Sequence, residues 1–247
     1  DVTTDTWDGD TPEKINLPGY KPVYEGNMRQ IKLAAEAINR SKKPVIYAGG
    51  GVIASNGSEE LIALAKKANI PVNTTLLALG AFPEDDDLSL GMLGMHGTAY
   101  ANFAVHESDL LIAIGARFDD RVTGKVETFA PNAVVIHIDI DPTSISKNVK
   151  VDIPVVGDAR KILEELIKHV QYVERKEWFE SSSVWKEKYP LSYKKSSEEI
   201  KPQYVVQQIC EATKDKAIIT TEVGQNQMWA AQFYTYTKPR SFLSSGG

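Results

Sequence analysis

The stretch PVIYAGGGVIA, residues 44–54, decides the fold of this 247-residue chain. Its first part is a short apolar strand, and the glycines Gly49, Gly50 and Gly51 follow directly. An apolar strand without polar alternation is typical of a parallel sheet that helices cover on both faces. The stretch therefore predicts an α/β fold.

Neighbouring segments repeat this alternation of strand and helix. Helical spacing predicts helices within 25–44 and over 58–70, 98–108 and 158–170, and apolar runs predict strands over 44–50, 71–75, 109–116, 132–140 and 153–157. Ser58 and Asp158 stand where helix N-caps are expected. Right-handed crossovers then give a doubly wound, Rossmann-like parallel sheet.

Composition divides the chain into four parts. Residues 1–26 hold much Asp, Thr, Pro and Gly and indicate a linker, whereas 27–170 form the sheet domain. Residues 171–201 indicate a charged helical linker with large aromatic residues, and 202–247 begin a second α/β unit that is too short to close a core. Because the chain starts without Met and stops at SSGG, we expect a fragment of a longer protein.

Charge and hydropathy exclude several classes of function. The net charge is −5 and there is no basic cluster, which argues against nucleic-acid binding. No apolar run approaches the roughly 18 residues that span a bilayer, so we expect a cytoplasmic protein, or an organellar one if the source is eukaryotic. The single cysteine, Cys210, lies in an apolar helical stretch and is interpreted as a packed thiol rather than a nucleophile.

The glycine loop is the first candidate for ligand binding. Gly49, Gly51 and Ala54 fit the pattern G-x-G-x-x-G/A, in which the backbone approaches a pyrophosphate. The alternative is a tight turn from strand to helix. An NAD site would also need an acid at the end of the next strand, where Thr74 and Thr75 stand instead. We therefore expect a dinucleotide that is bound in another manner.

Residues 90–100, LGMLGMHGTAY, form a second candidate. Methionine and leucine give soft apolar contact to a flat ring, glycines allow close approach, and His96 could donate to a ring oxygen or phosphate. The alternative is a flexible loop with a surface histidine.

The third candidate is GARFDDRVTG, which follows the strand predicted over 109–116. Arg117 and Arg121 suit phosphate or carboxylate oxygens, and Asp119 and Asp120 could hold these arginines or meet ribose hydroxyls. The alternative is a solvated group of ion pairs. Ligands of open α/β sheets bind beyond the carboxyl ends of strands, which favours a site.

The fourth candidate is HIDIDP, residues 137–142, where Asp139 and Asp141 could grip a ribose. Asp158 is a further candidate, although it also suits a helix N-cap. Asp85 to Asp87 are interpreted as solvated. No Cys/His cluster has metal-ligand spacing and no nucleophile is paired with a base, so neither metal ligands nor catalytic residues are expected within the chain.

Taken together, AGGGV, MLGMHGTAYAN, GARFDDRVTGK, FAP, HIDIDP, GDA and VGQNQMWAAQFY…PRSFLSSGG resemble the large subunits of acetohydroxyacid (acetolactate) synthases, the flavin-containing branch of thiamine-diphosphate-dependent enzymes. The resemblance covers nearly the whole chain in order. It implies that 27–170 is the FAD-binding middle domain and that 202–247 opens the domain that binds thiamine diphosphate through Mg²⁺. It also implies that 1–26 is a linker from a missing N-terminal domain.

The resemblance implies roles for individual residues. FAD would be held by Gly49, Gly50, Gly51, Thr75, Leu76, Leu93, Gly94, Met95, His96, Gly115, Arg117, Asp119, Arg121, Val122, Asp139, Ile140, Asp158 and Ala159. Substrate would meet Arg121, Met95 and Asp120. Thiamine diphosphate would meet Val223, Gly224, Gln225 and Asn226, although the family usually has His at the last of these positions. Asn can donate to a phosphate oxygen but cannot carry a proton.

The implied activity is that of a transferase in branched-chain amino-acid biosynthesis. It decarboxylates pyruvate on thiamine diphosphate and joins the remaining unit to a second 2-oxo acid, giving 2-acetolactate or 2-aceto-2-hydroxybutyrate, while FAD is largely structural. The resemblance further implies a homodimer or homotetramer and a possible small regulatory subunit. The fragment alone is expected to be inactive. Two alternatives are a non-catalytic dinucleotide-binding module and another thiamine-dependent 2-oxo acid decarboxylase or carboligase.

Overall fold

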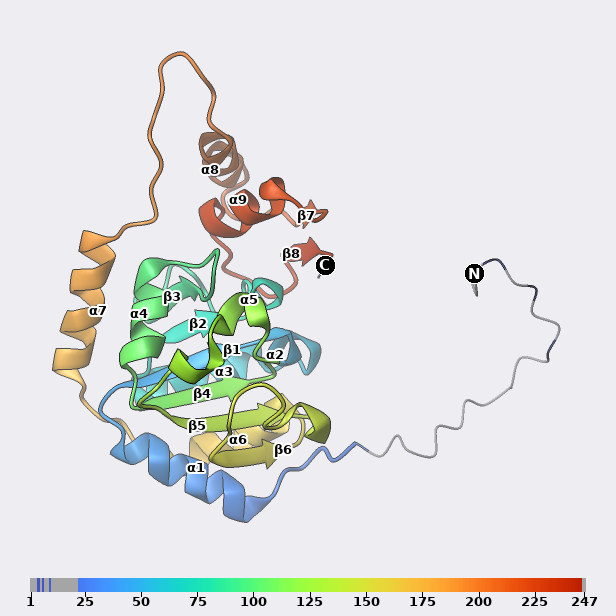
Figure 1. The fold of residues 1–247 in the computed structure, drawn as a ribbon, viewed down its shortest axis with the longest axis vertical. Coiled ribbons are helices and arrows are strands. Elements are labelled where there is room, and N and C mark those ends of the chain that lie inside the picture. Colours follow the sequence, from blue (N-terminus) through green and yellow to red (C-terminus); the bar gives the residue numbers. More distant parts are fainter. Residues whose placement is uncertain (1–3, 5, 7–8, 10–21, 246–247) are drawn as a thin grey trace.

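A computed structural model describes residues 4, 6, 9 and 22–245, so most of the linker expected over 1–26 lies outside the described residues, as do Gly246 and Gly247. The six-stranded sheet is parallel throughout, in the order β3-β2-β1-β4-β5-β6 (Figure 1). Its strands are β1 (Pro44–Ala48), β2 (Val72–Thr74), β3 (Ser89–Met92), β4 (Leu110–Ile114), β5 (Val134–Asp139) and β6 (Ile153–Val156). The predicted doubly wound parallel sheet is confirmed.

Helices cover both faces of this sheet. They are α1 (Met28–Arg40), α2 (Gly50–Ala54), α3 (Ser58–Ala68), α4 (Ala99–Glu107), α5 (Asp120–Thr123), α6 (Ala159–His169) and α7 (Lys176–Lys188), with the 3-10 turns η2 (Leu76–Ala78), η3 (Val126–Thr128) and η4 (Pro142–Ser144). Helices α1, α3 and α6 pack on one face, whereas α4 and α7 lie side by side on the other (Figure 1).

Strand β4 shows why the sheet has two cores. All five of its residues are buried, and successive side chains point to opposite faces. Ile112 and Ile114 join the core beneath α1, α3 and α6, whereas Leu111 and Ala113 join the core beneath α4 and α7. Each fully buried Ile or Leu contributes roughly 1.5–3 kcal/mol. An unbroken apolar run is therefore the sequence signature of a central strand.

One strand was not predicted and one cap was predicted wrongly. Residues 90–92, where a flexible loop was the alternative to a ligand-binding segment, belong to β3, and Gly91, at φ +72°, lies where the register against β2 shifts. Ser58 does not cap α3, because Gly57 is the N-cap and its carbonyl already accepts from the Leu61 amide. Ser58 is thus the first helical residue, and its buried hydroxyl has no partner among the described residues. The cap predicted at Asp158 is confirmed, since its side chain accepts from the Lys161 amide at 3.1 Å.

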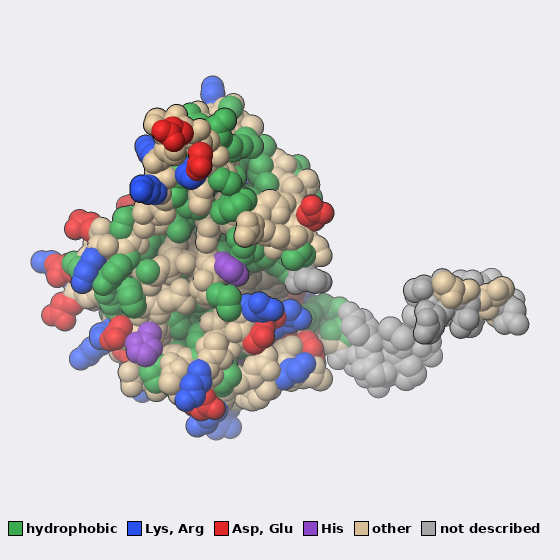
Figure 2. Space-filling view, turned by 45° about the horizontal axis from the view of Figure 1, so that its top comes forward, with side chains coloured by type: hydrophobic (Ala, Val, Ile, Leu, Met, Phe, Trp, Pro, Cys, Tyr) green, Lys and Arg blue, Asp and Glu red, His purple; other side chains and the backbone are tan. Residues whose placement is uncertain are grey.

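Residues 202–245 form a smaller unit that packs on the sheet domain. It contains α8 (Pro202–Thr213), β7 (Ile219–Thr221), α9 (Gln225–Phe233) and β8 (Phe242–Ser244), with β7 parallel to β8. Leu79 and Met92 of the sheet domain share a third core with Ala230, Tyr236 and Phe242 of this unit. Apolar side chains gather on its surface (Figure 2). Its exposed large apolar residues are Tyr204, Val205, Ile209, Ile218, Val223 and Leu243.

Cys210 lies at the edge of this third core and is only half-buried. Its sulfur accepts a hydrogen bond from the Thr235 amide at 3.4 Å, which places the thiol in a packing role. Among the described residues, none of the helices has the length and apolar character needed to cross a membrane.

Candidate functional site

Three cavities follow one another along the carboxyl ends of the strands, with volumes of about 290, 410 and 510 Å³. The first and second share Gly51 and Gly115, and the second and third share Leu76, Asp119, Arg121 and Val122. They therefore make one elongated depression, which we call the rim groove. It opens where β1 lies between β2 and β4, the point at which strand order reverses and ligands of such sheets bind.

Most of the residues assigned to FAD by resemblance meet at this groove. The first cavity is lined by Gly51, Gly115, Asp139, Ile140, Asp158 and Ala159, the second by Gly50, Gly51, Thr75, Leu76, Gly115, Arg117, Asp119, Arg121 and Val122, and the third by Leu76, Leu93, Met95, His96, Asp119, Arg121 and Val122. Gly50, His96, Arg117 and Asp139 thus share one edge of the sheet. Gly49 and Gly94 do not line the groove.

The glycine triplet has two separate roles. A Cβ atom on Gly49 would lie 2.1 Å from the Gly115 carbonyl oxygen, and one on Gly51 would lie 2.7 Å from the Gly115 Cα atom. These two glycines are required by the close approach of α2 to the end of β4. Gly50 lines the second cavity, and a Cβ atom on it would contact Leu77 at 3.3 Å. The tight-turn interpretation is therefore supported for Gly49 and Gly51, whereas ligand binding at the motif stays a prediction, for which Gly50 and Gly51 line the groove.

The arginine loop, residues 115–122, joins the second and third cavities. Arg117 and Arg121 are exposed, and Arg117 pairs with Asp119 at 3.2 Å. Asp119 is also the N-cap of α5; its interactions with the Asp120 side chain and the Arg121 amide hold the pKa of its carboxyl below the ordinary value. Asp120 points to solvent and lines none of the three cavities, so its predicted place in a substrate channel finds no support in this geometry.

Two of the three predicted acids, Asp139 and Asp158, line the first cavity, whereas Asp141 does not. Asp139, at the end of β5, lines the cavity, and Asp158 both lines it and caps α6. Asp141 instead binds the amide and hydroxyl of Thr143, which lower the pKa of its carboxyl. Of the two acids in HIDIDP, only Asp139 lines the first cavity, and one of its carboxylate oxygens accepts from the Asp141 amide at 2.9 Å.

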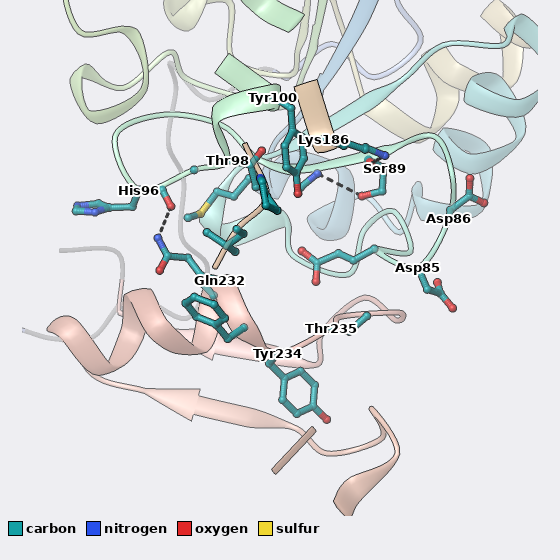
Figure 3. A pocket seen from close by; sticks show the side chains of 18 of the residues that line it. Asp85, Asp86, Ser89, His96, Thr98, Tyr100, Lys186, Gln232, Tyr234 and Thr235 are labelled. Carbon is teal, nitrogen blue, oxygen red and sulfur yellow. Dashed lines mark hydrogen bonds between the residues drawn. The ribbon is translucent and has the colours of Figure 1, made fainter. Parts of the chain in front are cut away.

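The glycine loop 93–98 closes the far end of the groove. The Met95 amide donates to the Arg121 carbonyl at 2.9 Å, and a Cβ atom on Gly94 would lie 2.9 Å from the same oxygen. Gly94, at φ +105°, is thus required for this contact with the arginine loop. On the other side, Gln232 of α9 donates to the His96 carbonyl at 2.8 Å (Figure 3). The loop therefore links the sheet domain to the smaller unit.

The residues assigned to thiamine diphosphate lie across the third cavity. Val223, Gly224 and Gln225 line it opposite Met95 and His96. Asn226 does not, and its side-chain oxygen would lie 2.6 Å from a Cβ atom on Gly224. The third cavity is thus formed jointly by the sheet domain and the smaller unit.

An unpartnered polar atom shows that the groove suits a polar ligand. The Thr75 hydroxyl is buried, lines the second cavity and has no hydrogen-bond partner among the described residues. With two exposed arginines and the Gly50 backbone lining the same cavity, this surface fits the phosphates and polyol of a dinucleotide. For Mg²⁺, the described residues hold no cluster of three or more His, Cys, Asp or Glu that could bind a metal.

Sequence comparison assigns the sheet domain that carries this groove to a known family. Residues 31–166 match the central domain of thiamine pyrophosphate enzymes. The chain belongs to this family.

Curated relatives of the whole chain include two acetolactate synthase large subunits and one probable acetolactate synthase large subunit. The chain is 49% identical over 240 residues to that of Buchnera aphidicola subsp. Schizaphis graminum, covering 96% of this chain and 42% of the relative. It is 47% identical over 242 residues to that of Haemophilus influenzae, covering 96% and 42%. It is 49% identical over 263 residues to the probable large subunit of Methanocaldococcus jannaschii, covering 100% and 44%. The chain thus spans less than half the length of these relatives.

A further cavity of about 530 Å³ lies outside the rim groove, and the sequence did not predict it. It lies beside the glycine loop, between α4, α7 and α9 (Figure 3). Lys186 donates to the Ser89 carbonyl at 2.8 Å, and burial lowers the pKa of its ammonium group. Of the acids predicted to be solvated, Asp85 and Asp87 are exposed, but Asp86 is half-buried and paired with Lys66.

Glu84 is the most perturbed acid of this cavity. Its carboxyl accepts from the Tyr236 amide at 2.7 Å, and its own amide donates to the Tyr236 carbonyl at 3.0 Å. Burial raises the pKa of Glu84 to about 8, opposed by the Tyr236 hydrogen bond and assisted by Asp85. No local sequence motif predicts the raised pKa of Glu84, because its hydrogen-bond partner Tyr236 lies 152 residues away. Glu84 therefore belongs to the contact between the sheet domain and the smaller unit.

Proposed function

We propose that this chain is the FAD-binding middle domain and the start of the thiamine-diphosphate-binding domain of an acetolactate synthase large subunit. The continuity of the rim groove carries the proposal, because FAD is long and needs adjoining sites of different chemistry. Acids at the first cavity suit ribose hydroxyls, arginines at the second suit phosphates, and apolar side chains at the third suit a flat ring.

Residues assigned to the flavin and residues assigned to thiamine diphosphate both line the third cavity. Leu76, Met92, Leu93 and Met228 give it a largely apolar lining and limit the access of water. When bound, thiamine diphosphate supplies the electron sink for decarboxylation. We assign the flavin contacts to the residues that line the groove, together with Gly49 and Gly94 beneath it, and the thiamine contacts to Val223, Gly224 and Gln225.

Arg121 is the residue best placed to orient substrate. It lines both the second and the third cavity, and its guanidinium is exposed. A planar guanidinium binds a carboxylate through two hydrogen bonds, so Arg121 can hold the carboxylate of pyruvate or of a second 2-oxo acid while other groups react. Met95, which lines the same cavity, supplies the apolar wall of this subsite.

The remaining parts of the proposal concern the complete protein. Mg²⁺ would be held by residues outside this chain. The large-subunit relatives support a small regulatory subunit as a partner, and a homodimer or homotetramer in the cytoplasm or an organelle. Asn226 would bind a diphosphate oxygen only after a change of its side-chain conformation, because it lies outside the groove.

Ligand selectivity tests the proposal on the chain itself. We expect FAD to remain bound after gel filtration at about one per chain, with much weaker binding of NAD and ADP. The complete large subunit should form acetolactate from pyruvate with thiamine diphosphate and Mg²⁺. Equal binding of NAD, ADP and FAD would instead indicate a general dinucleotide-binding module. Decarboxylation of a different 2-oxo acid by the complete protein would indicate another branch of the family.

A further inference from the structure

The arginine loop is held in place by side chains that lie outside the rim groove. Three consecutive carbonyl groups, those of Ala116, Arg117 and Phe118, accept hydrogen bonds from side chains of other elements. The Asn148 side chain donates to the Arg117 carbonyl at 3.2 Å and to the Phe118 carbonyl at 2.9 Å. Asn148 comes from the segment between η4 and β6 and lines none of the three cavities.

His137 holds the beginning of the loop from below. It is fully buried in β5, and its Nε2 atom lies 2.9 Å from the Ala116 carbonyl oxygen. Because a carbonyl only accepts, this nitrogen carries the hydrogen. The Phe118 ring packs edge-on against the His137 ring, with centroids 5.0 Å apart. The loop is thus anchored to the sheet by its second and fourth residues.

Phe118 explains why the loop needs this support. It is almost fully buried between Tyr47, Phe129 and His137, yet its backbone has φ +54°, a left-handed conformation that an aromatic residue rarely adopts. With Phe118 turned inward, Arg117 and Asp119 on either side turn toward the second cavity. The hydrogen bonds from Asn148 to the Arg117 and Phe118 carbonyls stabilise this strained turn.

We propose that Asn148 is a positioning residue for the arginine loop, which it holds along the rim groove ready to meet the ligand. The inference deepens the proposed function, since Arg117 and Arg121 are the groups assigned there to phosphate and substrate carboxylate. Because Asn148 lines none of the three cavities, it would act through the loop. Its exposed position means that its replacement need not disturb either core.

Hydrogen exchange tests the positioning without any ligand. The amides of Val122, Thr123 and Gly124 donate to Asp119 and Asp120 carbonyls, and the Met95 amide donates to Arg121, so all four depend on the loop. We expect Asn148→Ala and Asn148→Leu to speed their exchange by about 3- to 10-fold, the effect of losing one hydrogen bond of ordinary strength. Asn132→Ala, an exposed asparagine before β5, is the matched control. Unchanged exchange of these amides in both Asn148 variants overturns the inference.

Binding of FAD adds the functional readout. In the wild-type background we expect Asn148→Leu to raise the Kd for FAD by about 3- to 10-fold. In a background in which Arg117 and Arg121 are both alanine, we expect the same substitution to raise the Kd by less than about twofold. An equal loss in both backgrounds would show general destabilisation and would overturn the inference. A wild-type chain that binds no FAD would contradict the proposed function, whereas the exchange experiment would still decide the role of Asn148.

Discussion

Gly51 and Gly115 approach so closely that a Cβ atom on Gly51 would lie 2.7 Å from the Gly115 Cα atom. Gly115 also has φ +59°, so neither position accepts a side chain. We expect Gly51→Ala to lower the free energy of unfolding by about 1–3 kcal/mol, because α2 must move away from β4. The same movement distorts the first two cavities, so flavin should be lost. Urea unfolding and bound flavin per chain measure the two effects.

Gly50→Ala is the matched control for this change. Its Cβ atom would lie 3.3 Å from the Leu77 Cβ atom and 3.6 Å from the Leu77 carbonyl oxygen, and Leu77 is exposed. We expect the free energy of unfolding to change by less than about 1 kcal/mol. FAD affinity should nevertheless fall, because Gly50 faces the second cavity. Equal stability of the Gly50 and Gly51 variants would contradict this division of roles.

Arg117→Ala should weaken the retention of flavin. A charge-assisted hydrogen bond contributes about 1.5–3 kcal/mol, so we expect the Kd for FAD to rise about 10- to 100-fold. Stability should change by less than about 1 kcal/mol, because the ion pair with Asp119 is exposed. Lys125→Ala removes the same charge nearby and serves as the control. Full flavin stoichiometry after gel filtration of the Arg117 variant would count against the role.

Arg121→Ala should act on substrate more than on flavin. In the complete large subunit we expect the KM for pyruvate to rise about tenfold or more, because a bidentate partner of its carboxylate is lost. Arg121→Lys should fall between this variant and the wild type, since an ammonium keeps the charge but loses the planar fork. Steady-state kinetics at saturating FAD separates the two effects. Normal pyruvate kinetics in the alanine variant would refute the role.

Glu84 should make stability depend on pH. Its folded pKa of about 8 lies above the ordinary value of 4.5, so the folded chain retains a proton that the unfolded chain releases. Stability should therefore fall as pH rises from 5 to 8, by at most about 1.4 kcal/mol per pH unit. Glu84→Gln should flatten this slope and keep the acceptor for the Tyr236 amide. Thermal unfolding across this range measures it, with exposed Glu59→Gln as control, and an unchanged slope in Glu84→Gln would contradict the assignment.

Arg175 should be a main support of the linker. Its side chain is 4% exposed and donates to the carbonyls of Ile38, Ser41 and Ala68, at the ends of α1 and α3. We expect Arg175→Ala to cost about 2–4 kcal/mol, because buried carbonyls lose their donors, and Arg175→Lys to recover only part. The exposed Arg40→Ala provides the comparison in calorimetry. A loss below about 0.5 kcal/mol would show that water replaces the guanidinium.

Much of the fold could be predicted because its signals are local. The apolar runs of β1, β4 and β5 and the cap at Asp158 depend on adjacent residues only. Strand β3 was not predicted because Gly91 interrupts it, and its pairing with β2 supplies what its own residues lack. Ser58 is not the N-cap because α3 begins at Ser58 itself, one residue earlier than a cap there requires, with Gly57 as the N-cap.

The candidate site was predictable where residues follow strand ends, and not where distant segments meet. Asp139 ends β5, and Thr75 and Arg117 follow the ends of β2 and β4, so the topology alone brings them to one edge. The burial of Phe118, the role of Asn148 and the raised pKa of Glu84 all depend on contacts with residues remote in sequence. Charge patterns also overstate a site, as Asp141 and Asp120 show by facing away from the groove.

Arg175 has a consequence for movement between the two units. By joining the ends of α1 and α3 it fixes the start of α7, and α7 then runs along α4 toward the smaller unit (Figure 1). Three hydrogen bonds join the smaller unit to the sheet domain on the opposite side. They run from the Tyr236 amide to Glu84, from Gln232 to the His96 carbonyl, and from Arg240 to the Ile53 carbonyl. With both sides tethered, the width of the third cavity is preset, and access to it should be governed by small excursions of loops rather than by rotation of one unit against the other.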